Sequence, residues 1–148
     1  MPLGDILIIQ YGFYYGNYEK TMNESTFTQS LMRSLKKDGV YCLKIQTMLN
    51  NGVPDLWCSA KRDIWLEIKY RNNVPTRQST YFFPGLSALQ QQWMEGRLNE
   101  GRNVAVILGS PIGCYIYTNG QWAEGITRNQ LTMSKQDVIQ WIKDQTLV

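Results

Sequence analysis

The sequence predicts an α/β fold in which helices flank a central mixed β-sheet, in the order α-β-β-β-α-β, followed by a β-hairpin and a last helix. Two observations support this prediction. Apolar residues recur with helical spacing in three segments, and strand-like apolar runs lie between those segments. A helical segment also separates the third and fourth predicted strands, which permits a parallel crossover there.

The first predicted helix begins after Asn23 or Ser25 and ends near Lys37, where Gly39 can close it. Three apolar residues spaced four apart form its predicted buried face: Phe27, Leu31 and Leu35. Before this helix, residues 1–22 are interpreted as an N-terminal extension, in which residues 6–10 can form an edge strand.

Three strands are predicted next, at residues 40–46, 56–60 and 64–69, and a polar loop follows over residues 70–84. Both faces of the third strand are largely apolar, as is typical of a strand in the middle of a sheet. The second and third strands can form a hairpin around residues 61–63.

The second predicted helix is marked by Leu86, Leu89, Trp93 and Leu98 and ends near Gly101. Residues 104–108 are all apolar, which indicates a buried central strand. Residues 114–117 and 122–126 are predicted to pair as a hairpin, because Asn119-Gly120 between them favours a tight turn. The last helix is predicted to start at Ser134 and to bury Val138, Trp141 and Ile142.

The length of 148 residues fits a single domain over residues 1–148. Within it we expect the extension 1–22, a core at 23–108 and a C-terminal hairpin and helix at 109–148. No apolar run approaches the ~18 residues of a membrane span, and the first residues do not resemble a signal peptide. We therefore expect a cytoplasmic protein that does not enter membranes; a phage- or mobile-element-encoded protein acting in its host's cytoplasm fits this expectation.

The chain contains no histidine. This excludes Ser-His-Asp and Cys-His catalysis, His-ligated zinc and nucleases with a histidine base. The three cysteines are widely spaced and odd in number, which argues against disulfides or a zinc site and favours small core residues. The net charge of +3 permits a nucleic-acid partner without requiring one.

Two charged residues interrupt the third strand. Glu67 and Lys69 alternate with Ile68, so they project from the same face as Trp65. Asp55 opens the preceding strand, after Pro54 has stiffened the backbone. If the two strands form a hairpin, Asp55 lies across from the Glu67–Lys69 end, and two carboxylates and an ammonium converge there.

Two close carboxylates repel each other unless a cation lies between them. Hard oxygen ligands suit Mg²⁺, and we expect Mn²⁺ to substitute for it. Two further polar residues lie on otherwise apolar helix faces: Glu24 precedes Phe27 by three residues, and Gln90 lies between Leu86 and Trp93. Either could be a capping or satisfied core residue; both could also reach the acidic site.

In order along the chain, these pieces are similar to the PD-(D/E)XK nuclease superfamily, and within it to the VRR-NUC and Holliday-junction-resolvase-like branch. The matching residues are Glu24, Gly52-Val53-Pro54-Asp55, Trp65-Leu66-Glu67-Ile68-Lys69 and Leu86-Ser87-Ala88-Leu89-Gln90 with Trp93. The resemblance covers about residues 23–108 and implies a restriction-endonuclease-like core.

The resemblance implies a Mg²⁺-dependent DNA endonuclease. Asp55, Glu67 and the carbonyl of Ile68 would hold one or two metal ions, with Glu24 as a further ligand, direct or through water. Lys69 would orient or help deprotonate the attacking water. Gln90 would contact Lys69 or that water.

The loop after the catalytic strand favours DNA as the partner, because donors to phosphate alternate there with aromatic residues. Basic residues also outnumber acidic ones between Lys61 and Arg77. The candidate DNA-binding residues are Lys44, Arg71, Asn72, Asn73, Arg77 and Gln78.

A structure-selective enzyme acting on junctions or flaps is favoured, because the chain is small and has no obvious separate recognition domain. The alternatives are a sequence-specific homing or restriction enzyme, a non-catalytic DNA-binding domain with a nuclease fold, and a structural domain with coincidental acids. Residues 112–117 resemble the start of a GIY-YIG nuclease but lie too near the C-terminus for that fold.

Cutting two strands usually requires two active sites. We therefore expect a homodimer or higher symmetric homo-oligomer. Trp122, Trp141 and the Tyr-rich N-terminal segment are the candidate contacts between copies.

Overall fold

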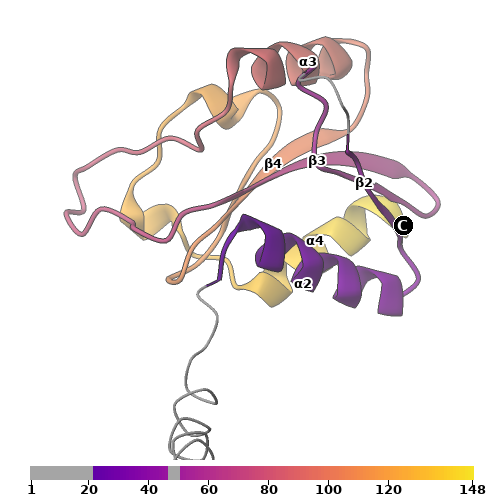
Figure 1. The fold of residues 1–148 in the computed structure, drawn as a ribbon, viewed down its shortest axis with the longest axis horizontal. Helices are drawn as coiled ribbons and strands as arrows, with labels where there is room; N and C mark the ends of the chain where they lie inside the picture. The colour runs from indigo at the N-terminus through magenta and orange to yellow at the C-terminus, as the bar shows by residue number, and fades with distance from the viewer. Residues whose placement is uncertain (1–21, 47–50) are drawn as a thin grey trace, which may run out of the picture.

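A computed structural model describes residues 22–46 and 51–148 of the chain, so the predicted strand at 6–10 and the Tyr-rich segment lie outside the described residues. A five-stranded sheet in the order β1-β2-β3-β4-β5 forms the centre, with α3 on one face and α2 and α4 on the other (Figure 1). The elements are α2 (Glu24–Lys37), β1 (Tyr41–Lys44), β2 (Leu56–Ser59), β3 (Asp63–Tyr70), α3 (Ala88–Asn99), β4 (Val104–Gly109), β5 (Tyr115–Tyr117), η1 (Gln121–Ala123), η2 (Arg128–Gln130) and α4 (Lys135–Thr146). The predicted fold class, a mixed sheet flanked by helices, is confirmed.

Helix α2 forms where the sequence predicts it. The side chain of Asn23 accepts a hydrogen bond from the backbone N–H of Thr26 and caps the helix. The helix ends before Gly39, whose φ of +91° lies in the left-handed region that glycine adopts without strain. Its predicted buried face is confirmed, since Phe27, Leu31 and Leu35 are all at most 3% exposed.

The sheet is antiparallel from β1 to β3, parallel between β3 and β4, and antiparallel again between β4 and β5. The hairpin that the second and third strands could form and the parallel crossover that the intervening helix permitted are therefore both present. Strand β3 lies in the middle of the sheet, hydrogen-bonded on both edges, and its side chains meet a hydrophobic layer on each face.

The two faces of the sheet bury separate hydrophobic cores. On one face, Leu56, Leu66 and Ile68 pack with α2 and α4. On the other, Val106 and Leu108 pack with Met94 of α3 and with segments that follow β5. Each hydrophobic core covers one face of β3 and β4 and excludes water from it. A polar side chain on either face of these strands is therefore buried, except where no side chain packs over it.

The predicted hairpin between residues 114–117 and 122–126 is wrong. Strand β5 pairs with β4 and not with residues 122–126, where η1 forms instead. Asn119 and Gly120 do adopt the positive φ values of a tight turn, 54° and 82°, but the turn leads into η1. Trp122 is thereby buried to 1% exposure. Burial of an indole of this size is a large hydrophobic contribution to this packing.

The burial of Trp122 also removes it as a surface on which a second copy could dock. Trp141, in α4, keeps part of its surface exposed and packs against the edge of the core that α2 and α4 cover. Helix α4 otherwise follows the prediction, with Ser134 as its N-cap and with Val138 and Ile142 fully buried.

The second predicted helix is shorter than its apolar residues indicate. Ser87 caps α3, so Leu86 lies before it, and Leu89 is 42% exposed and does not belong to the buried face. Met94 is the residue of α3 that is fully buried. Among the residues that the structure describes, no helix is both long enough and apolar enough to cross a membrane.

Gly52 holds the segment before β2 against the start of α3. Its φ is +80°, and a Cβ built on it would lie 2.2 Å from the backbone oxygen of Leu89. No side chain fits at that distance, and the obstacle is helix backbone that cannot swing aside. This close approach sets Asp55 and Gln90, which follow in their respective segments, near each other.

We expect Gly52→Ala to lower the free energy of unfolding by more than the matched change Gly85→Ala. Gly85 has a nearly identical φ of +81° but open space around it, so its substitution costs only the left-handed strain of about 1–2 kcal/mol. At Gly52 the clash adds about 1–3 kcal/mol. Urea denaturation of both variants measures the difference, and equal losses would contradict the close approach.

Candidate functional site

The carboxylate of Glu67 is the centre of the candidate site. Its side chain is fully buried in the middle of β3, with 0% exposure. The amide of Gln90 donates a hydrogen bond of 2.8 Å to its Oε2, and the ammonium of Lys69 lies 3.4 Å from the same oxygen. The other oxygen, Oε1, is buried without a hydrogen-bond partner among the described residues.

Asp55 lies beside Glu67 on the neighbouring strand segment. The antiparallel register pairs Leu56 with Leu66, which puts Asp55 opposite Glu67 one step further along. Oδ2 of Asp55 accepts a hydrogen bond of 3.2 Å from the backbone N–H of Ile68. The sequence prediction that Asp55, Glu67 and Lys69 converge is therefore borne out by the geometry.

Burial and charge crowding change the protonation of Glu67. Removal from water is the larger cause and the negative charge of Asp55 the next; against the opposing effect of Lys69, they raise the pKa of Glu67 from 4.5 to about 8. The core therefore contains a carboxyl group whose ionised form is strongly disfavoured and one of whose oxygens has no hydrogen-bond partner among the described residues, which is unusual. A cation at Oε1 would relieve both conditions.

Glu24 approaches this group from the first turn of α2. The spacing predicted that Glu24 continues the buried stripe of the helix, and this prediction is wrong, because its side chain reaches the surface. Partial removal of its carboxyl group from water is the main cause that raises the pKa of Glu24 above its usual value of 4.5. The positive charges of Lys69 and Lys44 oppose this shift, and the negative charge of Asp55 adds to it. The backbone N–H of Tyr70 also favours its ionised form. Glu24 and Lys44 thus belong to the rim of the same site.

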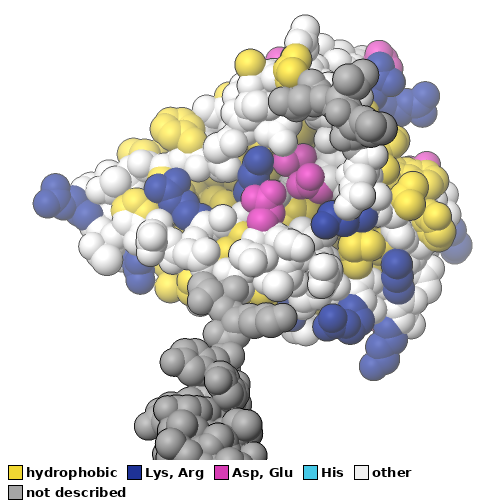
Figure 2. Space-filling view, viewed as in Figure 1, with side chains coloured by type: hydrophobic (Ala, Val, Ile, Leu, Met, Phe, Trp, Pro, Cys, Tyr) yellow, Lys and Arg dark blue, Asp and Glu magenta, His cyan; other side chains and the backbone are white. Residues whose placement is uncertain are grey.

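Acidic side chains gather in a hollow of the face shown in Figure 2, with basic side chains on several sides of it. Within residues 22–46 and 51–148, no three Asp, Glu, Cys or His side chains approach closely enough to form a complete metal cage. The groups that could hold a cation are Asp55, Glu67 and the backbone carbonyl of Ile68. Two carboxylates suffice for Mg²⁺, which is bound in proteins through one or two carboxylates and keeps several waters.

The predicted DNA-binding residues of the loop after β3 are at the surface. Asn72, Asn73, Arg77 and Gln78 are exposed, and Arg71 is half-buried. The guanidinium of Arg71 donates to the carbonyl of Asn73 and stacks over the ring of Phe82, 5.0 Å from its centre. Arg71 is therefore held in one position beside the end of β3.

Besides its hydrogen bond to Glu67, Gln90 helps to cap α3. The three-residue spacing of Ser87 and Gln90 in the sequence is typical of such a cap. Oε1 of Gln90 accepts a hydrogen bond from the backbone N–H of Ser87, while its backbone N–H donates to the Ser87 hydroxyl, forming a capping box. One end of the amide is thus fixed by the helix cap and the other by Glu67. The resemblance implied a contact with Lys69 or water; the structure shows the contact with Glu67.

A row of aromatic residues beside Glu67 was not predicted as part of the site. Trp57, Trp65 and Trp93 are half-buried and in contact with one another on the same face of the sheet. The signal in the sequence was the position of Trp65, two residues before Glu67 on the same face of the strand.

No family model and no curated protein matches the sequence. Among solved structures, the fold is similar to Hjc, a Holliday junction resolvase of Archaeoglobus fulgidus, with a TM-score of 0.53 and 16% sequence identity over 78% of this chain and 97% of that one. A VRR_NUC domain is a second neighbour, with a TM-score of 0.43 and 20% identity over 59% of this chain and 84% of that domain.

The five-stranded mixed sheet and its helices thus form a restriction-endonuclease-like fold similar to that of this resolvase. The predicted resemblance to the resolvase branch is confirmed at the level of the fold.

Proposed function

We propose that the protein is a metal-dependent DNA endonuclease that selects its substrate by DNA structure, such as a junction or a flap. The observation that carries this proposal is the buried Glu67, whose Oε1 is unsatisfied and whose charged form needs a cation. The likeness of the fold to a Holliday junction resolvase supports the same class of substrate.

Mg²⁺ is the proposed cofactor, with Mn²⁺ able to replace it. Asp55, Glu67 and the Ile68 carbonyl would hold it, and Glu24 would assist directly or through water. When bound, such an ion lowers the pKa of a water nucleophile and neutralises charge that develops on the phosphate. It would also stabilise the ionised form of Glu67 that the apo protein disfavours.

The side chains of the chain have separable tasks. Lys69 is held beside Glu67 by their 3.4 Å ion pair while keeping 18% of its side chain exposed, so its ammonium can reach both the acidic pair and a phosphate. There it would orient the attacking water and offset negative charge in the transition state. Gln90, by donating to Glu67, keeps that carboxylate in one orientation.

The phosphate backbone would be bound by the rim of the site. Lys44, Arg71, Asn72, Asn73, Arg77 and Gln78, from β1 and the loop after β3, would supply positive charge and hydrogen-bond donors for it. Contacts of this kind position DNA without reading its sequence. This property supports selection by DNA shape over a sequence-specific homing or restriction activity.

A symmetric homodimer would give the enzyme two active sites for two strands. With Trp122 buried, Trp141 remains the described aromatic candidate for contact between copies. Light scattering of the purified protein measures the mass. A monomer at all concentrations, with DNA and without it, would contradict this part of the proposal.

We expect Asp55→Asn and Lys69→Met each to lower cleavage of a flap or four-way junction by at least about 100-fold, because the first removes a proposed metal ligand and the second removes the positive charge that offsets charge on the phosphate. Mg²⁺ and Mn²⁺ should support cleavage and EDTA should abolish it. The measurement is single-turnover cleavage of end-labelled DNA. Asp144→Asn in α4 and Lys37→Met in α2, on the two helices that cover the opposite face of the sheet, are matched controls with charges that should not matter.

Cleavage that survives Asp55→Asn, or that is lost equally in the Asp144→Asn control, would contradict the assigned roles. A preference among flap, junction, single strand and linear duplex would separate a structure-selective enzyme from a site-specific one. If every substrate stays intact and Mg²⁺ neither binds nor raises the melting temperature, the catalytic proposal fails.

The pH dependence of stability provides a second test. In the folded protein Glu67 keeps its proton up to about pH 8, whereas in the unfolded chain it loses the proton above its ordinary pKa of 4.5. The unfolded state therefore binds fewer protons in this range, and the free energy of unfolding should fall as the pH rises from about 5 to about 8 in EDTA. Below pH 4.5 this contribution is fully retained.

Glu67→Gln should remove that slope, because a neutral amide of the same shape does not titrate. Chemical denaturation across the pH range compares the two proteins, and the absence of histidine keeps the background titration small. Mg²⁺ should raise the stability of the unsubstituted protein at high pH and leave Glu67→Gln almost unaffected. Parallel pH profiles for the two proteins in EDTA would contradict the raised pKa.

A further inference from the structure

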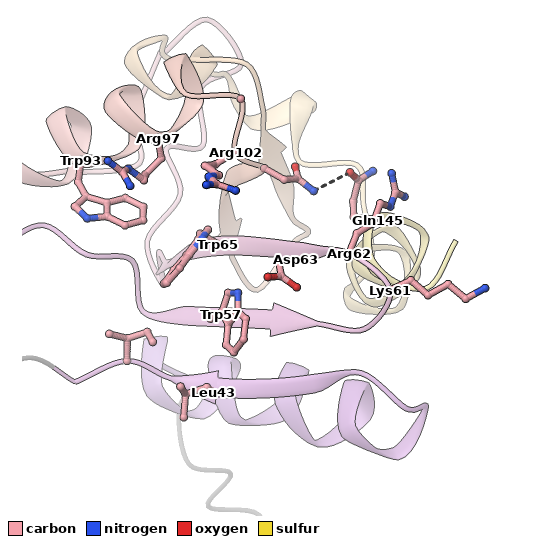
Figure 3. Close-up of a pocket in the computed structure, with 13 residues that line it drawn as sticks. Leu43, Trp57, Lys61, Arg62, Asp63, Trp65, Trp93, Arg97, Arg102 and Gln145 are labelled. Atoms are coloured by element: carbon pink, nitrogen blue, oxygen red, sulfur yellow. Dashed lines mark hydrogen bonds between the residues drawn. The ribbon is translucent and has the colours of Figure 1, made fainter.

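A groove of about 940 Å³ runs across the sheet face that carries Glu67. Figure 3 shows Leu43, Trp57 and Trp65 on three successive strands, with Trp93 and Arg97 of α3 facing them across the groove. Leu43 pairs with Trp57 and Trp57 with Trp65 in the strand register, so these side chains form one row across the sheet.

The aromatic rings of this row are in contact with one another and reach solvent. The ring centres of Trp57 and Trp65 are 6.0 Å apart and those of Trp65 and Trp93 are 5.3 Å apart, while Tyr41 adds an edge contact to Trp57 at 5.9 Å. Tyr41 is 57% exposed and the three indoles are half-buried. Neighbouring rings restrain each indole, so little rotamer freedom remains to be lost when a flat ligand stacks on it.

The groove is positively charged. Four basic residues and one acidic residue line it: Lys61, Arg62, Arg97, Arg102 and Asp63. Arg97 lies over the ring of Trp93, 5.8 Å from its centre, and pairs with Glu100. Arg102 is exposed and forms no ion pair with any acid in the described part of the chain, so it is available to an anionic ligand.

The same elements that carry the candidate active site carry the aromatic row. Trp65 lies two residues before Glu67 on one face of β3, a separation of about 7 Å along a strand. On α3, Trp93 lies one helical turn after Gln90. A nucleotide next to a phosphate bound at the proposed metal site beside Glu67 therefore has its base within reach of the groove.

Aromatic rings in a basic groove are the combination that binds single-stranded nucleic acid, because bases stack on the rings and the phosphates interact with the cations. A base inside a duplex is stacked on its neighbours and cannot occupy such a position. We infer that this groove binds the unpaired bases adjacent to the cleaved phosphate, with Trp57 and Trp65 as the stacking residues and Arg102 as a backbone contact. The inference rests on the proposed nuclease function and narrows its substrate to DNA with a single-stranded segment at the cut.

A second copy of the chain is the competing occupant of this face. Charge argues against it, because a symmetric interface would bring two sets of basic lining residues together with a single acid on each side. Leu43 discriminates between the two occupants. It lies in the same row and is 43% exposed, so it would contribute to a protein interface, but an aliphatic side chain offers no ring for a base to stack on.

The first experiment measures binding without cleavage. In EDTA, fluorescence anisotropy gives the affinity for a short labelled oligothymidine and for a blunt duplex of equal charge. Trp57→Ala should weaken single-strand binding about tenfold, within the range known for loss of one stacked base, and should leave duplex binding unchanged. Trp57→Phe should recover most of the affinity, and Leu43→Ala should bind like the unsubstituted protein.

Arg102→Gln tests the phosphate contact, with Lys37→Gln on the opposite side of the sheet as the matched control. The slope of log affinity against log salt for the oligothymidine should fall by about 0.7 in the first variant and stay constant in the second. Melting temperatures of all variants ensure that only folded proteins are compared.

Single-strand binding that is unaffected by Trp57→Ala would overturn the inference. So would a change of molecular mass in both Trp57→Ala and Leu43→Ala with unchanged single-strand binding, because the groove would then be an interface between copies. The outcome is separable from the nuclease proposal: stacking measured in EDTA stands even if no cleavage occurs with Mg²⁺, and cleavage of flaps that is insensitive to Trp57→Ala leaves the nuclease standing without this groove.

Discussion

The site depends on a carboxylate buried in the middle of a sheet. Glu67 occupies a position on β3 where its neighbours are apolar, and its ionised form is disfavoured there. Gln90 and Lys69 satisfy one of its oxygens and leave the other unsatisfied within the described part of the chain. A buried carboxyl group with a raised pKa lowers the free energy of unfolding at neutral pH. Groups of this kind are concentrated at functional sites, which supports the proposal that a ligand binds at Glu67.

The surrounding architecture brings partners to that carboxylate from three directions. The antiparallel register brings Asp55 beside it, the crossover through α3 brings Gln90 over it, and the first turn of α2 brings Glu24 to its rim. Gly52 makes the second of these possible, because only a residue without Cβ can approach the backbone of Leu89. The glycine before Asp55 is therefore a packing requirement of the site as well as a turn.

The same face of the sheet gives the site two unlike neighbours. On one side the loop after β3 presents polar and basic side chains suited to phosphates; on the other the Trp57–Trp65–Trp93 row presents rings suited to bases. Trp65 and Glu67 share one strand, so the distance from the stacking surface to the candidate catalytic group is set by backbone geometry. Rigid placement of this kind favours selection by the shape of the substrate.

The sequence by itself determined the mixed α/β class and, once β2 and β3 form a hairpin, the convergence of Asp55, Glu67 and Lys69, because strand alternation then leaves few alternatives. It could not determine how the C-terminal segment packs: the Asn119-Gly120 turn predicts a hairpin, and only the tertiary structure showed that burying Trp122 favours η1 instead. Likewise, the exposure of Glu24 and Leu89 and the contact of Gln90 with Glu67 depend on how α2 and α3 are placed on the sheet. The aromatic row was also decided at this level, because it joins two strands and a helix that local patterns cannot relate to one another.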